Sequence, residues 1–235
     1  MWFWIKATLA SVLGLFYLKT NNSHGKGWLA EYVLHKLLEK ELKGQDARIF
    51  RDVLLERPNG RLSQIDLIVA CRRGIFVIEV KNLNGQIFGS KEDKRWMQAL
   101  AYRHSKRYFY SPLKQNATHL KAVQEVLGVA PAKLFNVVAL SGFGKLITPI
   151  PGVLSLGRVP QYILRQRSSR LSQSEVDAFA AALKQAHRAD QEAREKHQTQ
   201  VESYKGGNRP EKAPTGPLRP AVRTSRRPSR QFKKT

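Results

Sequence analysis

Two apolar runs dominate the hydrophobic pattern of the chain, at residues 65–70 and 74–80, on either side of a short basic turn. Val, Ile and Phe prevail in both runs, as in strands that are buried on both faces. Gly74 can adopt the positive φ that a tight hairpin turn requires. The pattern therefore predicts a hairpin of two central strands whose turn is centred between Arg72 and Arg73.

Three charged residues, Asp66, Glu79 and Lys81, lie within these strands. The predicted turn places Asp66 directly opposite Glu79, with Cβ atoms about 4.5–5.5 Å apart, where like charges destabilise a sheet. Lys81 is two residues beyond Glu79 and therefore points to the same face. Converging carboxylates beside a lysine indicate a divalent-metal site. In the alternative interpretation, backbone amides satisfy the carboxylates and Lys81 forms an ion pair with one of them.

The remaining pattern alternates helices with strands and predicts an α/β fold, a mixed central sheet flanked by helices. Helices are predicted at residues 25–43, ended by Gly44, at 111–127 with Pro112 in the first turn, and after the capping box of Ser172 and Glu175. Further strands are predicted at residues 47–55, at 134–140, and at 85–89 on an edge of the sheet.

Four short motifs together resemble the nuclease-related domain (NERD) family of the PD-(D/E)xK nuclease-like superfamily, over roughly residues 25–185. They are Gly-x-x-x-Glu at 27–31, Gln-Ile-Asp at 64–66, Ile-Glu-Val-Lys-Asn at 78–82, and Ser-Pro-Leu-Lys-Gln at 111–115, where the family has Asn in place of Ser111. The resemblance implies a restriction-endonuclease-like fold in which Asp66 and Glu79 hold Mg²⁺ or Mn²⁺. It implies that Lys81 activates or orients water, and that Glu31 and Gln115 support the site.

The chemistry that such a site serves is phosphodiester hydrolysis. Hard cations prefer carboxylate and water oxygens as ligands, and they polarise a phosphate and activate a water. We therefore expect a metal-dependent nuclease that acts on DNA, with RNA as the alternative substrate. Two alternatives remain: a non-catalytic adaptor that binds nucleic acid or is tethered to a membrane, and a structural envelope protein with a vestigial domain. For Glu31 itself, the alternative is an ordinary solvated residue on a helix.

The composition of the chain indicates a polyanionic partner. The 235 residues include 41 basic and 18 acidic ones, a net charge of +23, which favours nucleic acid or an anionic membrane surface. A single cysteine, Cys71, excludes an intrachain disulfide and a cysteine-based zinc site. Basic and aromatic residues are interleaved in residues 90–110, which suits phosphate contacts and base stacking. The alternative is an amphipathic loop or helix whose aromatic residues belong to the core. The candidate nucleic-acid contacts are Lys94, Arg95, Trp96, Arg103, Lys106 and Arg107, with Arg226 and Arg227 near the C-terminus.

The two ends of the chain differ from its middle. Residues 2–18 are apolar except for Lys6, Thr8 and Ser11, which predicts a membrane anchor at 1–20; a cleaved signal peptide or an interfacial helix is the alternative. Basic residues directly after it predict a single-pass protein whose domain, 21–190, faces the cytoplasm. Residues 191–235 are rich in proline and basic residues and predict a disordered tail that contacts nucleic acid or anionic lipid. The pattern gives no sign of oligomeric state.

Overall fold

The computed structural model describes residues 23–100, 105–166 and 170–207. The predicted anchor, Arg103, Arg226 and Arg227 lie outside these residues. Within them, no helix combines the length and the apolar character needed to cross a bilayer.

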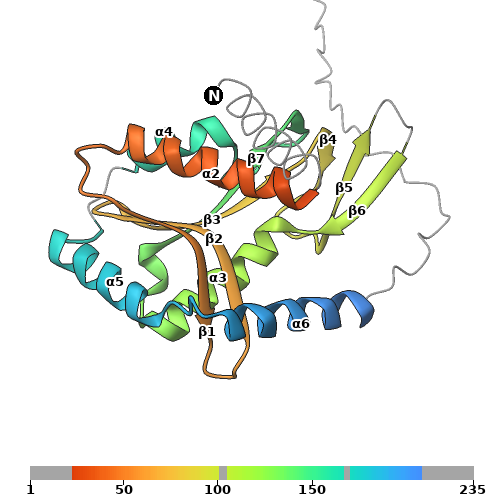
Figure 1. Ribbon diagram of the computed structural model, residues 1–235. Coiled ribbons are helices and arrows are strands. Elements are labelled where there is room, and N and C mark those ends of the chain that lie inside the picture. The colour runs from red at the N-terminus through yellow and green to blue at the C-terminus, as the bar shows by residue number, and fades with distance from the viewer. Residues whose placement is uncertain (1–22, 101–104, 167–169, 208–235) are drawn as a thin grey trace, which may run out of the picture.

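The first sheet has five strands in the order β1-β2-β3-β7-β9 (Figure 1). Strand β2 (Leu62–Cys71) pairs antiparallel with β1 (Arg48–Glu56) on one side and with β3 (Gly74–Asn82) on the other. Strands β7 (Leu134–Ser141) and β9 (Val153–Ser155) continue the sheet in parallel. The mixed α/β class predicted from the sequence is confirmed, with Asp66 and Glu79 on the central strands β2 and β3.

The hairpin of β2 and β3 has the predicted register. Cys71 pairs with Gly74 and Leu67 pairs with Ile78, so the turn is centred between Arg72 and Arg73. Gly74 adopts a φ of 137°, and a Cβ atom at this position would lie 2.5 Å from the ring of Phe135. Both facts require glycine here, because an L side chain would be strained and would clash.

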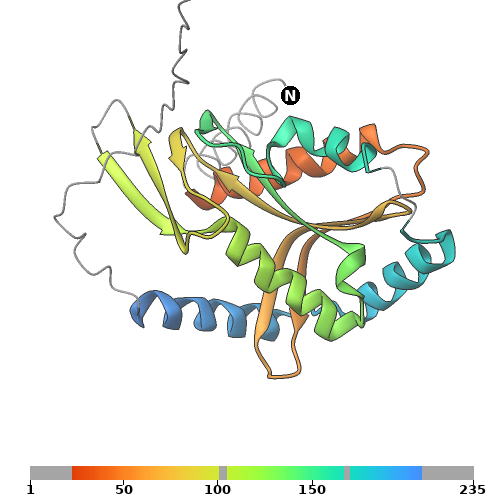
Figure 2. The same cartoon turned by 180° about the vertical axis from the view of Figure 1, so that it is seen from behind.

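Helices cover both faces of the first sheet (Figures 1 and 2). On one face lie α2 (Ser23–Glu41) and α4 (Val159–Leu164), where Leu34 and Leu38 pack against Phe76 and Ile78. On the other face lie α3 (Pro112–Leu127) and α5 (Gln173–Ala186), where Val123 and Val176 pack against Ile68 and Val77. Short 3₁₀ helices, η2 (Pro131–Lys133) and η3 (Leu156–Arg158), connect these elements.

A second sheet was not predicted from the sequence. It contains β4 (Gly85–Phe88), β5 (Arg95–Leu100), β6 (Ser105–Tyr110) and β8 (Gly144–Leu146) in the order β6-β5-β4-β8. The strand predicted at residues 85–89 is present as β4, but its predicted edge position is wrong, because β4 lies between β5 and β8. Trp96 and Phe109 pair across β5 and β6 and turn inward, and the fully buried Trp96 packs in a cluster with Ile87 and Leu113.

The C-terminal part of the described chain is more ordered than its composition indicates. Ser172 and Glu175 form the predicted capping box of α5. Helix α6 (Gln191–Gly207) then occupies the first part of the predicted tail. Ala193 packs against Leu54 and Leu62, and the side-chain amide of Gln200 exchanges two hydrogen bonds with the backbone of Leu62. The prediction of a disordered tail is therefore corrected for residues 191–207.

Asn116 joins α3 to the sheet. Its Nδ2 group donates to the carbonyl oxygens of Val77 on β3 and Val137 on β7, at 2.8 and 3.0 Å. The same nitrogen lies 2.8 Å from Oδ1 of Asn136. Replacing Asn116 with Ala removes these bonds in a buried place and is expected to lower the free energy of unfolding by about 2 kcal/mol. Urea unfolding monitored by circular dichroism measures this loss.

Thr118→Ala is the matched control, because it is exposed on the same helix and should change the free energy of unfolding by less than about 0.5 kcal/mol. Equal effects of the two substitutions would contradict this account of Asn116.

Glu175 gives α5 a dependence on pH. Its hydrogen bond with Lys133, followed by those with Ser172, lowers its pKa from 4.5 to about 2. A lowered folded-state pKa stabilises the protein above the ordinary value and ceases to do so as the pH falls toward 2. Wild type should therefore unfold at a higher temperature than Glu175→Gln at pH 7, by a small margin because the side chain is exposed. That margin should shrink between pH 5 and pH 3; a margin independent of pH would refute the assignment.

Candidate functional site

The backbone pairing of β2 and β3 stops where the carboxylates begin. The last pair of the ladder is Leu67 with Ile78, and the next position in register would join Asp66 and Glu79. There the backbone N–H of Val80 donates instead to Oδ2 of Asp66, at 2.7 Å. A side-chain carboxylate thus takes the place of a strand carbonyl, and it fixes the Asp66 carboxyl group beside the C-terminal part of β3.

The pairing of β1 with β2 is interrupted at the same level. Arg51 pairs with Leu67 and Val53 with Ile65, whereas Asp52, between them, has a φ of 54°, uncommon for a residue other than glycine. Its carboxylate accepts hydrogen bonds from Gln64 at 2.6 Å and from Arg194 at 2.9 Å. Both strands bend sharply in their middle (Figure 1). The bend brings a further carboxylate to the level of Asp66.

Glu79 is the most buried carboxylate of this group, with 2% of its surface exposed. Lys81 forms an ion pair with its Oε1 atom, and Nε2 of His119 lies 3.3 Å from its Oε2 atom. Burial raises the pKa of Glu79, but His119 and Lys81 together outweigh burial and hold it below the ordinary value. Glu79 is therefore ionised at neutral pH, and its buried Oε2 atom has no well-aligned hydrogen-bond donor.

The pKa values of Asp66 and Glu31 are raised, whereas that of Glu79 is lowered. Burial, followed by the charges of Glu79 and Glu31, raises the pKa of Asp66 well above its ordinary value. Burial, followed by the charge of Asp52, raises the pKa of Glu31 to about 7. The structure thus brings together Asp66, Glu79, Lys81 and Glu31, as predicted. Burial and the mutual repulsion of the carboxylates together outweigh the charge of Lys81 and, for Glu31, that of Arg51, so an additional cation at this point is electrostatically favoured.

His119 was missed in the sequence analysis. It lies on α3 four residues after Gln115, so the two side chains occupy the same helix face. This spacing was the one available signal, because Glu79 lies forty positions earlier in the sequence. Gln115 is half-buried on that face, and its supporting role stays a prediction.

The described residues among the predicted nucleic-acid contacts lie on the second sheet or directly before it, and not among the carboxylates. Lys94, Arg95, Lys106 and Arg107 are exposed. Trp96 is the exception, because its ring is fully buried and its Nε1 donates to the carbonyl of Ser90. The prediction that Trp96 contacts nucleic acid is therefore wrong.

The carboxylate pair fits a hard divalent cation. No cluster of three or more His, Cys, Asp or Glu residues suited to a metal ion occurs among the residues that the structure describes. Mg²⁺, however, is commonly held by one or two carboxylates and keeps several of its waters. The unbonded Oε2 of Glu79 and the raised pKa of Asp66 are both relieved by a positive charge between the two side chains.

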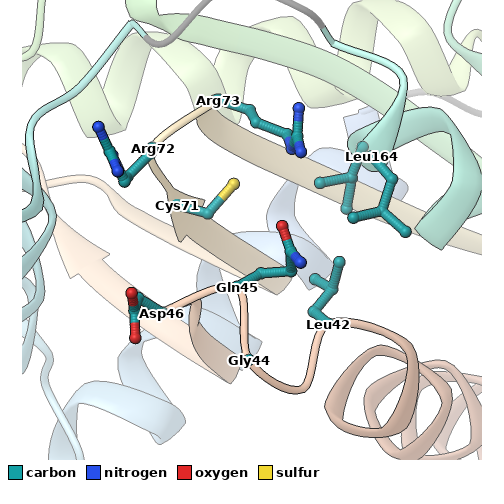
Figure 3. Close-up of a pocket in the computed structure, with 9 residues that line it drawn as sticks. Leu42, Gly44, Gln45, Asp46, Cys71, Arg72, Arg73 and Leu164 are labelled. Carbon is teal, nitrogen blue, oxygen red and sulfur yellow. The ribbon is translucent and has the colours of Figure 1, made fainter.

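A cavity of about 320 Å³ lies at the opposite end of the β2–β3 hairpin. Its lining includes Gln45, Cys71, Arg72 and Arg73 (Figure 3). Burial raises the pKa of the Cys71 thiol, which keeps it protonated at neutral pH. The cavity adjoins the turn of the hairpin, whereas Glu79 and Lys81 lie toward the other end of β3, so it is not part of the carboxylate site.

Comparison with known proteins agrees with this geometry. The nuclease-related domain family matches residues 26–141. An uncharacterized protein of Bacillus anthracis is 34% identical over 99 residues, which cover 42% of this chain and 45% of that relative. The chain thus spans less than half of the relative's length. No solved structure gives a significant match. The residues that match the nuclease-related domain family, 26–141, contain all the carboxylates of the site together with Lys81 and His119.

Proposed function

We propose that this protein is a metal-dependent nuclease that hydrolyses phosphodiester bonds in DNA, and that RNA is a further substrate. The proposal depends on one observation: two opposed carboxylates, Asp66 and Glu79, beside Lys81 at the point where β2 and β3 separate. The family match supports a nuclease-related function, and the net charge of +23 supports a polyanionic substrate. The family also implies that the first sheet with its helices is restriction-endonuclease-like.

Asp66 and Glu79 would hold Mg²⁺ or Mn²⁺ through carboxylate oxygens, with water as the remaining ligands. When bound, such an ion polarises the scissile phosphate and lowers the pKa of a water molecule.

The other side chains of the site supply charge and a proton acceptor. The Lys81 side chain is 28% exposed, so its ammonium group borders both Glu79 and solvent. It is placed to stabilise negative charge that develops on a phosphate oxygen. Glu31, with a pKa of about 7, exchanges its proton near neutral pH, as suits a group that accepts a proton from water. His119 holds the orientation of the Glu79 carboxylate from α3.

A non-catalytic nucleic-acid-binding role is the second candidate. It is favoured by the contacts of Asp66 with the Val80 N–H and of Glu79 with Lys81, which partly satisfy both carboxylates without a metal. In this case the basic surface binds nucleic acid and no bond is cleaved.

We further propose that residues 2–18 anchor the protein in a membrane and that the domain faces the cytoplasm. The support is the sequence pattern: an apolar stretch with aromatic residues at both edges, followed by basic residues. The basic residues beyond position 207 would then be available to nucleic acid or to anionic lipid.

Cleavage of labelled single- and double-stranded DNA and RNA by the full chain tests the main proposal. Cutting should require Mg²⁺ or Mn²⁺ and stop with chelator. Asp66→Asn and Glu79→Gln should each slow it at least about a hundredfold, because several kcal/mol of charge stabilisation depends on these oxygens. Glu39→Gln removes a charge from an exposed position on α2 and should leave the rate unchanged.

Two results would decide against catalysis. One is nucleic-acid binding without cutting; the other is metal-dependent cutting that persists in both carboxylate variants, which would indicate a contaminating nuclease. The first result would support the non-catalytic candidate.

His119 offers a separate test of the site. Its removal leaves Glu79 without its neighbour on α3, and the loss of such a supporting contact typically costs about 10-fold to 100-fold in metal affinity or activity. We therefore expect His119→Ala to raise the Mg²⁺ concentration for half-maximal cleavage by that factor. His35→Ala, on α2, where the partly buried ring lies beside Glu39, is the control. An unchanged Mg²⁺ requirement in His119→Ala would contradict the positioning role.

A further inference from the structure

The second sheet has one face that no other described element covers. Across β5 and β6, Arg95 pairs with Tyr110, Met97 with Tyr108, and Ala99 with Lys106. Because side chains alternate between the faces of a sheet, the side chains of these pairs share one face. We call it the outer face.

The opposite, inner face is part of the protein core. Ile87 and Trp96 point to that side and are fully buried. They pack in one cluster with Leu113 of α3 and Val138 of β7, and Phe109 packs against the cluster. None of the residues of the outer face belongs to a core cluster of the described chain.

The outer face combines exposed aromatic rings with positive charge. Tyr108 and Tyr110 are 43% and 48% exposed, and the guanidinium of Arg95 lies 5.6 Å from the centre of the Tyr108 ring. Lys106 is exposed beside them. The four strands, all within the described residues, contain no Asp or Glu, whereas the basic residues Arg95, Lys106 and Lys145 lie on the outer face.

This combination favours single-stranded nucleic acid over a duplex. Tyr108 and Tyr110 are two residues apart on one strand, so their Cα atoms are about 7 Å apart along it. Successive bases of an unpaired strand can stack on such rings while lysine and arginine contact the phosphates, whereas a duplex keeps its base faces inside the helix. We propose that the outer face of the second sheet is a stacking platform for single-stranded nucleic acid.

The platform is joined directly to the carboxylate site. Strand β4 begins at Gly85, four residues after Lys81, and α3 begins at Pro112, two residues after Tyr110. In both views the second sheet adjoins the start of α3 (Figures 1 and 2). The inference rests on the nucleic-acid substrate proposed above and names its class: a single-stranded segment, bound beside the site that cleaves it.

Binding without cleavage tests the platform. The full chain, kept in chelator, is titrated into a labelled single strand of about twelve nucleotides, within the roughly 4–16 nucleotides that such surfaces cover. The same measurement is made with a duplex and with an abasic strand of equal length. Tyr108→Leu and Tyr110→Leu should each weaken single-strand binding roughly 5-fold to 100-fold. Tyr108→Phe and Tyr110→Phe keep the ring and should bind as wild type does.

The salt dependence of the binding affinity distinguishes the contribution of base stacking from that of phosphate contacts. The leucine variants should keep the slope of log affinity against log salt, whereas Lys106→Ala should reduce it by about 0.7. The leucine variants should also bind the abasic strand as wild type does, since that strand has no bases to stack. Unaltered melting temperatures of the variants show that folding is intact.

Three results would overturn the inference. They are equal affinity of wild type and leucine variants for the single strand, a preference of wild type for the duplex, and a wild-type dimer that the leucine variants convert to monomer, which would make the outer face an interface between copies. Because the assay contains no metal, absence of cleavage leaves the inference standing. Conversely, normal cleavage by leucine variants that bind normally would refute the platform and leave the nuclease intact.

Discussion

The hydrogen bond from the Val80 N–H to the Asp66 carboxylate organises the site, because it ends the backbone ladder between β2 and β3 without leaving that N–H unpaired. A buried N–H without an acceptor would cost about 1–3 kcal/mol. The two strands can therefore separate at this point because the Asp66 carboxylate accepts the hydrogen bond. The same bond holds Asp66 near Glu79. Burial, followed by repulsion from Glu79, raises the pKa of Asp66 despite that bond. The geometry that separates the strands therefore also places two repelling carboxylates where the proposed cation would bind.

The second constraint is the attachment of α3, because a helix can bring His119 to Glu79 only in one rotation about its axis. Asn116 sets that rotation through its bonds to the carbonyls of Val77 and Val137. These carbonyls belong to adjacent strands, so a shift of the helix would break both bonds. Glu31 reaches the site from α2, on the other face of the sheet. The positions of the site carboxylates thus depend on helices that pack against both faces of the first sheet.

Elements specified by residues that are close in the sequence could be predicted, whereas elements stabilised by contacts between residues far apart in the sequence could not. The register of the hairpin follows from Gly74 and the two arginines, and the start of α5 follows from Ser172 and Glu175. Strands β5 and β6 were missed because polar residues, Gln98 and Arg107, occupy inward positions and interrupt the apolar alternation. Helix α6 was missed because it is held mainly by polar contacts, such as those of Gln200 with Leu62. Such contacts leave no hydrophobic pattern in a sequence.

The link between the two sheets shows how binding on one surface can direct a strand toward chemistry on another. After Lys81 the chain passes through residues 82–84 into β4, and this link is fixed from two sides. The carbonyl of Asn84 accepts from Gln98 on β5, and its side chain accepts from the N–H of Phe143. Gly142 permits the β7–β8 turn to approach, since a Cβ atom there would lie 2.7 Å from the carbonyl of Leu83. A strand bound to the outer face would therefore be held by elements that cannot move independently of Lys81. Rigid positioning of this kind lets binding energy contribute to the orientation of a scissile phosphate.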